Sequence, residues 1–342
     1  MQQKPQTWRD LLGSLNESEK RRIVEKLEIQ GKTLDRWISG HTGLPRSRKI
    51  QQLFTLLPAN TRPLFVTLLQ QDPGFAKYAN EIALPRLNLE IPSAFYARIL
   101  ETNVSTTGSL RFTAVCQLTL EQAIGLLDPD SFGLYMTILK CTPSSHGGKI
   151  RSLRQQSSMG THPWSAIIDG TRFFFGEESV VGQAVMKESP FVLQDIHSHG
   201  NSKQLSIHQD EYVVSTAALR IQREGRIAGA LLVASTQANF FTPSRLAILQ
   251  QYCNLVVVAI GDDEFYQLQQ IEFGRMPPVS VQQEYIAQIH KRISARVKQA
   301  PRGERLKMWP EAERDVIHQI EDELLALAAQ EQTRKSSSDD AS

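Results

Sequence analysis

The chain has 342 residues, more than one ordinary domain of about 100 to 200 residues holds, which predicts two domains and a tail. Hydrophobic residues make up 41% and charged residues 22% of the sequence, a composition that excludes disorder over most of the length. The formal net charge of only +2 excludes an overall polycation, but residues 1–75 hold 12 Lys and Arg against 7 Asp and Glu.

Helical periodicity fills the first seventy residues, where apolar side chains recur at every third or fourth position. Thr7 and either Asn16 or Ser18 are suited to cap helix starts, and Gly31 and Gly40 are suited to end helices. The basic N-terminal part is therefore predicted to be a small all-α domain.

The segment RRIVEKLEIQGKTLDRWISGHTGLPRSRKIQQLFTLLP resembles the helix-turn-helix family of phage-repressor type, and the resemblance covers about residues 7–70. It implies that the helix TLDRWISG enters the major groove of double-stranded DNA. The outward side of that helix would carry Lys32, Thr33, Arg36 and Ser39.

The chemistry of these side chains fits a DNA surface. Arg36 can form two hydrogen bonds to a guanine edge. A helix start near Ser47 offers backbone amides to a phosphate, and further phosphate contacts are predicted for Lys32, Arg46, Arg48 and Lys49. Asp35 on the same helix weakens DNA affinity unless it accepts from a cytosine amine or pairs with a cation. The alternative is a solvated basic bundle.

Residues 76–92 are predicted to be a linker, because DPGFAKYANEIALPRLNLEIP contains three prolines and little periodicity. Helical patterning resumes over residues 93–127, with an interruption at about 106–108. Short runs rich in Val, Ile, Leu, Phe and Tyr then predict strands: FGLYMTILKC, KIRSLRQQSS, SPFVLQDI, VVSTAALRIQ and RIAGALLVAS. The segment REG predicts a hairpin between the last two strands, and VVGQAVMK predicts a short helix. Thr242 and Pro243 predict the start of a buried closing helix.

Two segments resemble the GAF domain family over about residues 92–265: GEESVVGQAVMKESPFVLQDI and STAALRIQREGRIAGALLVASTQANFFTPSRLAILQQYCNLVVVAI. The resemblance implies a mixed or antiparallel sheet of five or six strands, helices on one face, and a ligand cavity on the other under irregular loops. The expected fold class is α+β, with the helix-turn-helix head at 1–75, the sensor domain at 93–265 and a helical extension at 266–342.

The helical extension carries one apolar pattern and then loses it. Ile317, Ile320, Leu324 and Leu327 predict a seam of at most two heptads, which serves either dimerisation or packing onto the chain's own domain. A disordered end is expected from Ser336 onward. We expect a homodimer and leave its interface open.

Two segments contain candidate ligand-binding residues. Within RSLRQQSSMGTHPWSAIIDGTRFFFGEES, Arg154, Trp164 and Phe174 can form a wall for an anionic or planar ligand; alternatively, the aromatics fill the core and the arginine faces water. The segment DIHSHGNSKQLSIHQDEY holds His197, His199 and His208 among acidic residues. Its spacings match no firm metal template, so a polar loop without metal is favoured and the cofactor is left unknown.

Signatures of catalysis are missing from the sequence: a nucleophile elbow, a phosphate-binding glycine loop, HExxH and the kinase motifs. Cys116, Cys141 and Cys253 lie far apart in apolar runs, as buried thiols of a reducing compartment do. They lack the histidine neighbour of a bilin-binding cysteine, and their spacing disfavours the sulfoxide-reducing GAF members. A thiol enzyme using Cys141 is a remote alternative, and we expect no enzyme.

The sequence thus predicts a transcriptional regulator whose DNA-binding head is controlled by a small molecule in the GAF-like cavity. Since it has no long apolar run and no secretory signal pattern, we expect it to be cytoplasmic and independent of membranes. The alternative is a non-catalytic signalling adapter whose helical head binds a protein.

Overall fold

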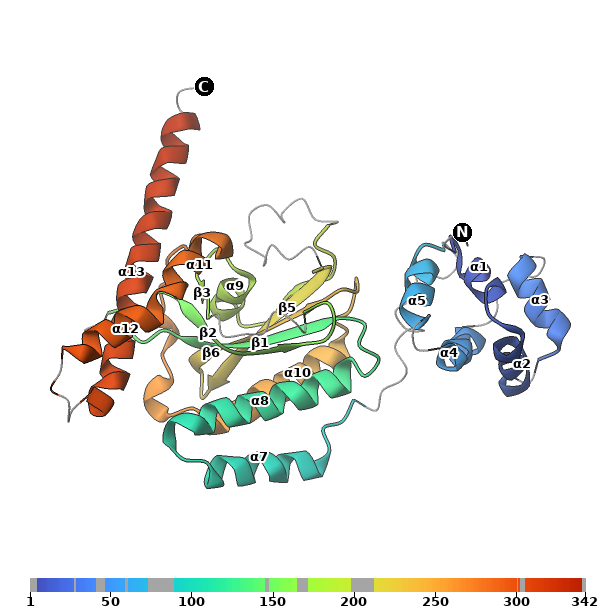
Figure 1. The fold of residues 1–342 in the computed structure, drawn as a ribbon, viewed down its shortest axis with the longest axis horizontal. Helices are drawn as coiled ribbons and strands as arrows, with labels where there is room; N and C mark the ends of the chain where they lie inside the picture. The colour runs from blue at the N-terminus through green and yellow to red at the C-terminus, as the bar shows by residue number, and fades with distance from the viewer. Residues whose placement is uncertain are drawn as a thin grey trace. The chain divides into compact units, whose positions relative to one another are not determined.

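The computed structural model describes residues 5–27, 29–40, 47–58, 61–72, 89–144, 148–164, 172–197, 212–299, 301 and 305–339. The chain divides into two compact units, Met1–Asn88 and Leu89–Ser342. Most of the segment predicted to be a linker lies outside the described residues, which resume at Leu89. Each unit is described by itself below, and Figure 1 gives the element labels.

The first unit is helical, as the sequence predicts. Its described helices are α1 (Trp8–Gly13), α2 (Glu17–Lys26), α3 (Gly31–Ser39), α4 (Ser47–Leu56) and α5 (Arg62–Gln70). Their apolar faces meet in one core, and Trp8 at the start of α1 donates from Nε1 to Asp72 Oδ2 after α5, at 2.7 Å. This bond joins the two ends of the helical unit.

Local side chains explain where these helices begin and end. Thr7 and Asn16 each form a capping box, which confirms both predicted caps. Gly40 ends α3 in the left-handed conformation at φ 74°, also as predicted. The expectation that Gly31 ends a helix is wrong: Gly31 is the first residue of α3, because α2 already stops at Lys26.

The second unit is built on a six-stranded sheet in the order β3-β2-β1-β6-β5-β4, and each pair of neighbouring strands is antiparallel. Its strands are β1 (Leu134–Cys141), β2 (Leu153–Gly160), β3 (Phe174–Phe175), β4 (Phe191–Leu193), β5 (Ser215–Arg223) and β6 (Arg226–Ser235). The predicted hairpin is confirmed, and its two turn residues Glu224 and Gly225 both have positive φ, as a type I′ turn requires. β3 was not predicted because two residues carry no alternation.

Three long helices cover one face of the sheet: α7 (Ser93–Ser105), α8 (Gly108–Leu127) and α10 (Pro243–Val256) (Figure 1). Thr242 caps α10 by accepting from the Arg245 amide, as the sequence predicts. The short helix α9 (Val180–Met186) packs on the opposite face, over β5 and β6. The predicted α+β class, with its antiparallel sheet and helical tail, is confirmed.

Strand alternation decides which side chains face the long helices. Along β1, Leu134, Met136 and Ile138 enter the core with α8 and α10, whereas Tyr135 and Thr137 face the other side. A bulge between Ile138 and Leu139 leaves Gln156 of β2 as an extra residue. The two faces of the sheet therefore carry separate sets of polar groups.

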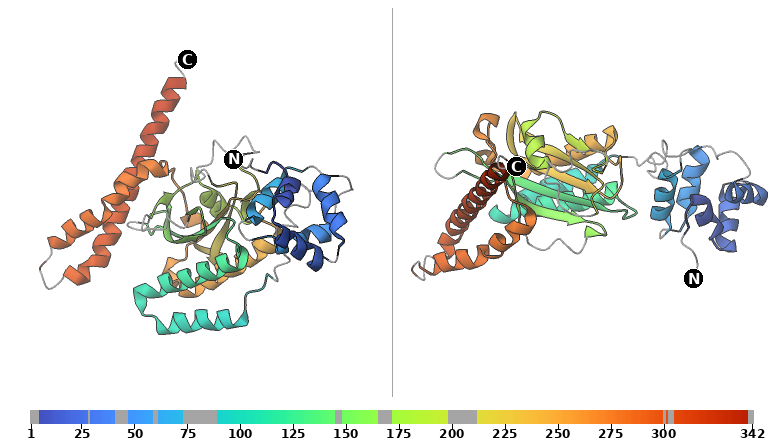
Figure 2. Two further views of the ribbon diagram at one scale, coloured as in Figure 1. Left: turned by 45° about the vertical axis from the view of Figure 1, so that its right-hand side comes forward. Right: turned by 90° about the horizontal axis from the view of Figure 1, so that it is seen from above.

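The C-terminal extension belongs to the same compact unit as the sheet. Short 3₁₀ turns at Val257–Ala259, Asp262–Glu264 and Leu268–Gln270 lead to α11 (Val279–Ala287), α12 (Ile289–Lys298) and α13 (Arg305–Asp339) (Figure 2). α13 continues to Asp339, past Ser336 where disorder was expected, because extending an existing helix costs far less than starting one.

α13 packs onto its own unit along a stripe at every fourth residue: Ala312, Val316, Ile320, Leu324 and Ala328. Ile317 and Leu327 of the predicted heptad seam are only half-buried. The stripe contacts Ile293 and Val297 of α12 and Phe174 of β3. The helix thus serves packing onto its own domain, which is one of the two alternatives that the sequence left open.

Polar contacts complete this attachment. Glu321 of α13 is buried, accepts from Arg151 Nη2 at 3.0 Å, and accepts from Ser152 Oγ at 2.5 Å. Gln282 of α11 closes the free edge of β3 by exchanging two hydrogen bonds with the Phe174 backbone, at 2.8 and 2.9 Å. Among the helices in the described ranges, none combines the length and apolar character that crossing a membrane requires.

Candidate functional site

The exposed side of α3 carries the cations that the sequence assigned to DNA. Leu34 and Trp37 are buried in the helical core, which turns Lys32 and Arg36 outward into solvent. Thr33 is half-buried, and Ser39 is exposed with its hydroxyl donating to the Arg36 carbonyl at 3.3 Å. Asp35 is exposed on the same helix. The outward surface of α3 is therefore polar and contains two cations and one carboxylate.

Lys49 has a partner other than a phosphate. Its Nζ donates to the carbonyl oxygen of Leu27 at 2.5 Å, at the C-terminal end of α2. Arg22 of α2 donates in return to the Leu56 carbonyl at the end of α4. Both helix ends are thus neutralised by a cation from the partner helix, as the helix dipole favours. These two cations hold the bundle together, so we assign Lys49 a structural role in place of the predicted phosphate contact.

The remaining residues of the predicted DNA surface lie at the start of α4 and in the segment before it. Arg46 lies outside the described residues, as do the side chains of Ser47 and Arg48. The backbone of α4 does begin at Ser47, where the sequence expected a helix start.

The α9 side of the sheet carries a polar floor, which we define as Tyr135, Thr137, Gln155 and Ser158. Gln155 Nε2 donates to the Tyr135 hydroxyl at 3.1 Å and to the Ser158 hydroxyl, and Ser158 donates to Thr137 Oγ1 at 3.0 Å. Within the described part of the chain, Gln155 Oε1 is buried and has no hydrogen-bond partner. A buried carbonyl oxygen left unpaired costs free energy, so this atom is a candidate acceptor for a ligand.

Of the predicted aromatic and cationic wall, only Trp164 adjoins this floor. Its ring is buried, with its centroid 6.1 Å from that of Tyr135. Arg154 and Phe174 lie together on the other face of the sheet, with the guanidinium carbon 5.8 Å from the ring centroid. Arg154 lies opposite Lys140 in the register of β2 and β1, and Lys140 Nζ lies 4.6 Å from the ring centroid of Phe112 on α8. The wall is wrong as a single surface, because the bulge at Gln156 reverses the alternation of β2 and places even-numbered residues before and after it on opposite faces.

The predicted histidine loop falls mainly outside the described residues, which include neither His199 nor His208. His197 is exposed, and its backbone amide donates to Asp195 Oδ1 at 2.9 Å. Among the described residues, no group of three or more His, Cys, Asp or Glu side chains is arranged to hold a metal ion.

The thiols are poorly suited to nucleophilic chemistry. Cys116, Cys141 and Cys253 are all free and buried. Burial raises the pKa of Cys141 to about 12 and raises the pKa of the other two thiols as well. A thiolate is the reactive form of cysteine, and these positions disfavour it at neutral pH.

Comparison with known proteins identifies the domain that carries the floor. Residues 109–261 match the family model of the GAF domain. This part of the chain is a GAF domain. It contains both the polar floor and the buried thiols. A search of curated proteins gave no match.

Solved structures similar to the GAF domain include the GAF domain of an Acinetobacter phosphoenolpyruvate-protein phosphotransferase, at 15% identity and TM-score 0.37 over 52% of this chain and 93% of that one. Another is the free methionine-R-sulfoxide reductase of Neisseria meningitidis in complex with its substrate, at 14% identity and TM-score 0.33 over 52% and 98%. A third is residues 122 to 287 of a methyl-accepting chemotaxis protein. Its sequence identity is 14% and its TM-score 0.35, over 48% of this chain and 93% of that one. These sequence identities and TM-scores are too low for the function of any of these proteins to be transferred to this chain.

Sequence reasoning missed the polar floor, although a signal for it was present. The run QQSS places four polar residues inside β2 of a sheet whose other central strands are apolar. Polar side chains at inward positions of a buried strand indicate either an internal network or a ligand contact. The bulge at Gln156, which decides the face that each of them takes, could not be read from the sequence.

Proposed function

We propose that the chain is a non-catalytic regulator in which the GAF domain binds a small molecule and the helical head binds double-stranded DNA. The observation that carries the DNA part is the outward position of Lys32 and Arg36 on α3, whose opposite side is buried in the helical core. A helix fixed by its apolar side and cationic on the other meets the requirement for entering a major groove.

For the sensor part, the polar floor is the candidate ligand site. The unpaired Gln155 carbonyl can accept a hydrogen bond from a ligand. This acceptor favours a small molecule with a donor group. Such a ligand controls DNA binding if its affinity differs between the DNA-competent and incompetent states.

Recovery of genomic DNA bound to the chain in cells tests the DNA part. We expect the enriched fragments to share one sequence motif, because direct contact with base edges discriminates between sites. Fragments without a shared motif, together with saturable binding of a protein partner, would favour the signalling adapter instead.

We also propose that the chain forms a homodimer through the α7 stripe, which we define as Tyr96, Leu100 and Val104. These residues recur at every fourth position on the helix farthest from the sheet, and Leu100 is 57% and Val104 82% exposed. An exposed apolar stripe on a helix suits packing against the same helix of a second copy.

Replacing Leu100 and Val104 together by glutamate tests this interface. Both side chains already face solvent, so we expect the variant to fold normally while its dimer dissociation constant, measured by sedimentation equilibrium, rises at least about tenfold. Met186→Glu is a control because Met186 is an exposed apolar residue on α9 at the opposite face. A wild-type chain that stays monomeric throughout the titration would contradict the interface.

A further inference from the structure

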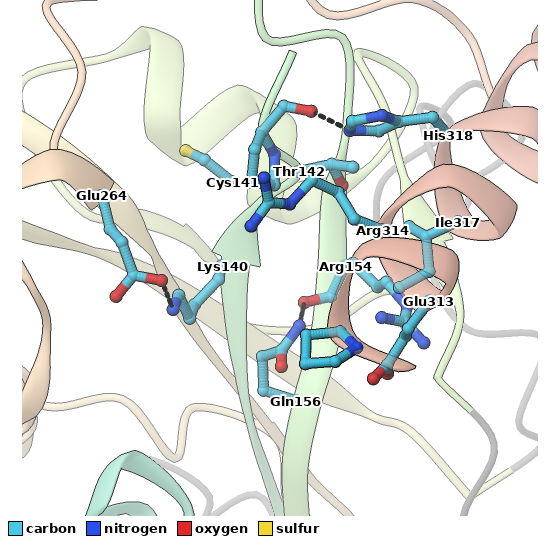
Figure 3. Close-up of a pocket in the computed structure, with 12 residues that line it drawn as sticks. Lys140, Cys141, Thr142, Arg154, Gln156, Glu264, Glu313, Arg314, Ile317 and His318 are labelled. Atoms are coloured by element: carbon cyan, nitrogen blue, oxygen red, sulfur yellow. Dashed lines mark hydrogen bonds and ion pairs between the residues drawn. The ribbon is translucent and has the colours of Figure 1, made fainter. Parts of the chain in front are cut away.

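A second polar site lies on the long-helix side of the sheet, between the sheet and α13. A pocket of about 220 Å³ opens there, and we call it the α13 pocket (Figure 3). Its polar lining comes from β1, β2 and the 3₁₀ turn Asp262–Glu264 on one side and from α13 on the other, and includes Lys140, Arg154, Glu264, Glu313, Arg314 and His318. It is separated from the polar floor by the thickness of the sheet.

Arg154 is the unusual member of this lining. Its side chain reaches from β2 toward α13 (Figure 3), yet the residue is only 8% exposed. Within the described part of the chain, its Nε is buried and has no hydrogen-bond partner. A buried guanidinium with an unused donor costs free energy that an apolar residue beside Phe174 would not cost. An anion in the pocket would supply the missing partner.

The surrounding charges leave the pocket net positive. Lys140 is ion-paired with Glu264, so these two charges offset each other. Of the lining carboxylates, Glu313 is then left to Arg154 and Arg314, and among the described residues it forms no ion pair with Arg154 within 4.0 Å. Arg172, outside the lining, adds a further positive charge near Arg154. Arg314 is exposed and reaches from α13 toward the end of β1 (Figure 3). One added negative charge between the two guanidinium groups would balance the site.

The structure also defines the pocket's walls. His318 Nε2 donates to the Pro143 carbonyl at 2.6 Å, which holds α13 against the chain after β1. Gln156, the bulged residue, donates to the Arg154 carbonyl at 3.2 Å and lines the α13 pocket on the β2 side. The pocket volume of about 220 Å³ is smaller than the roughly 300–1,000 Å³ of pockets for drug-sized molecules, so it suits a small ligand.

We propose that the α13 pocket binds a small anion carrying a carboxylate or phosphate group, which bridges Arg154 of β2 and Arg314 of α13. Guanidinium groups form paired, charge-assisted hydrogen bonds with both kinds of anion. Binding joins the sheet to α13 and therefore holds that helix more firmly. This site goes beyond the proposed function and does not depend on DNA binding.

Isothermal titration calorimetry of the full chain with inorganic phosphate and, separately, with succinate tests the proposal. We expect saturable one-to-one binding of at least one of them, and a comparison of the two distinguishes phosphate from carboxylate recognition. Arg154→Met weakens the affinity at least about tenfold and Arg314→Met several-fold. Glu313→Gln strengthens it, because a competing negative charge is removed.

Arg296→Met is the matched control, since Arg296 also pairs with an α13 residue, Asp315, but lies outside the pocket lining. Its affinity for either anion should equal that of the wild type. Should Arg154→Met fail to fold, the opposite shifts in the exposed Arg314→Met variant and in Glu313→Gln still decide the question. Absence of saturable binding of both anions to the wild type, or unchanged affinity in Arg314→Met and Glu313→Gln, overturns the proposal.

Discussion

Replacing Lys32 and Arg36 together by alanine is expected to lower the affinity of the chain for its DNA site about 100-fold. Arg36 would lose a contact with a base edge worth about 1–3 kcal/mol, and Lys32 a contact with a phosphate. Both side chains are exposed on α3 and neither belongs to the buried core, so the head should keep its fold. Electrophoretic mobility shift with a recovered genomic site measures the change.

The double variant Lys291→Ala with Lys298→Ala is the control, because it removes the same charge from α12 of the other unit. It should bind DNA as the wild type does. The dependence of affinity on salt should also become shallower for the α3 variant, by about one counterion for each lost phosphate contact. If the α3 variant binds as tightly as the control, the cationic side of α3 is not the DNA surface.

Glu321→Ala is expected to destabilise the GAF-containing unit by about 3 kcal/mol, since the substitution leaves Ser152 and Arg151 without a buried acceptor and opens a cavity. Arg151 retains Asp322 as a partner at 2.6 Å, which limits the loss. Hydrogen exchange should show faster exchange of the α13 amides, and urea denaturation gives the change in unfolding free energy. Glu331→Ala, at an exposed position on the same helix, should change stability by less than about 0.5 kcal/mol.

The isosteric Glu321→Gln separates charge from shape. Burial raises the pKa of Glu321 above its ordinary value of 4.5, against the opposing effects of Ser152 and Arg151. The folded chain therefore keeps a proton that the unfolded chain has released, and stability falls as the pH rises from 4.5 through the folded value. The glutamine variant lacks this dependence, so its stability relative to the wild type should increase across that window. A constant difference between pH 4 and pH 8 would contradict the role of burial.

The boundaries of many elements could be read from the sequence, because their signals are local. Thr7, Asn16 and Thr242 cap helices by accepting from amides three positions away. Gly40 and Gly225 adopt positive φ, which other residues adopt at a cost in free energy. Alternation and apolar runs similarly predicted β1, β5 and β6. Each of these features depends on neighbours along the chain.

The candidate sites depended on contacts between distant residues, which local patterns do not specify. Arg154 and Trp164 are ten positions apart in sequence, yet they lie on opposite faces of the sheet, because of strand alternation and the bulge at Gln156. The sequence predicted that Lys49 contacts a phosphate. In the structure its Nζ donates to the carbonyl of Leu27, 22 positions away, which gives it a structural role.

Periodicity and capping act within a few residues, so the sequence by itself predicted the α+β class and the helical head, and the resemblance of two segments to a known family predicted the GAF domain. Only the tertiary structure decided that α13 packs on its own unit, that the polar floor and the α13 pocket occupy separate faces, and which cations of the head remain outward. The physical reason is that burial and pairing of a charged side chain depend on the elements that fold against it, and the sequence does not state which elements these are.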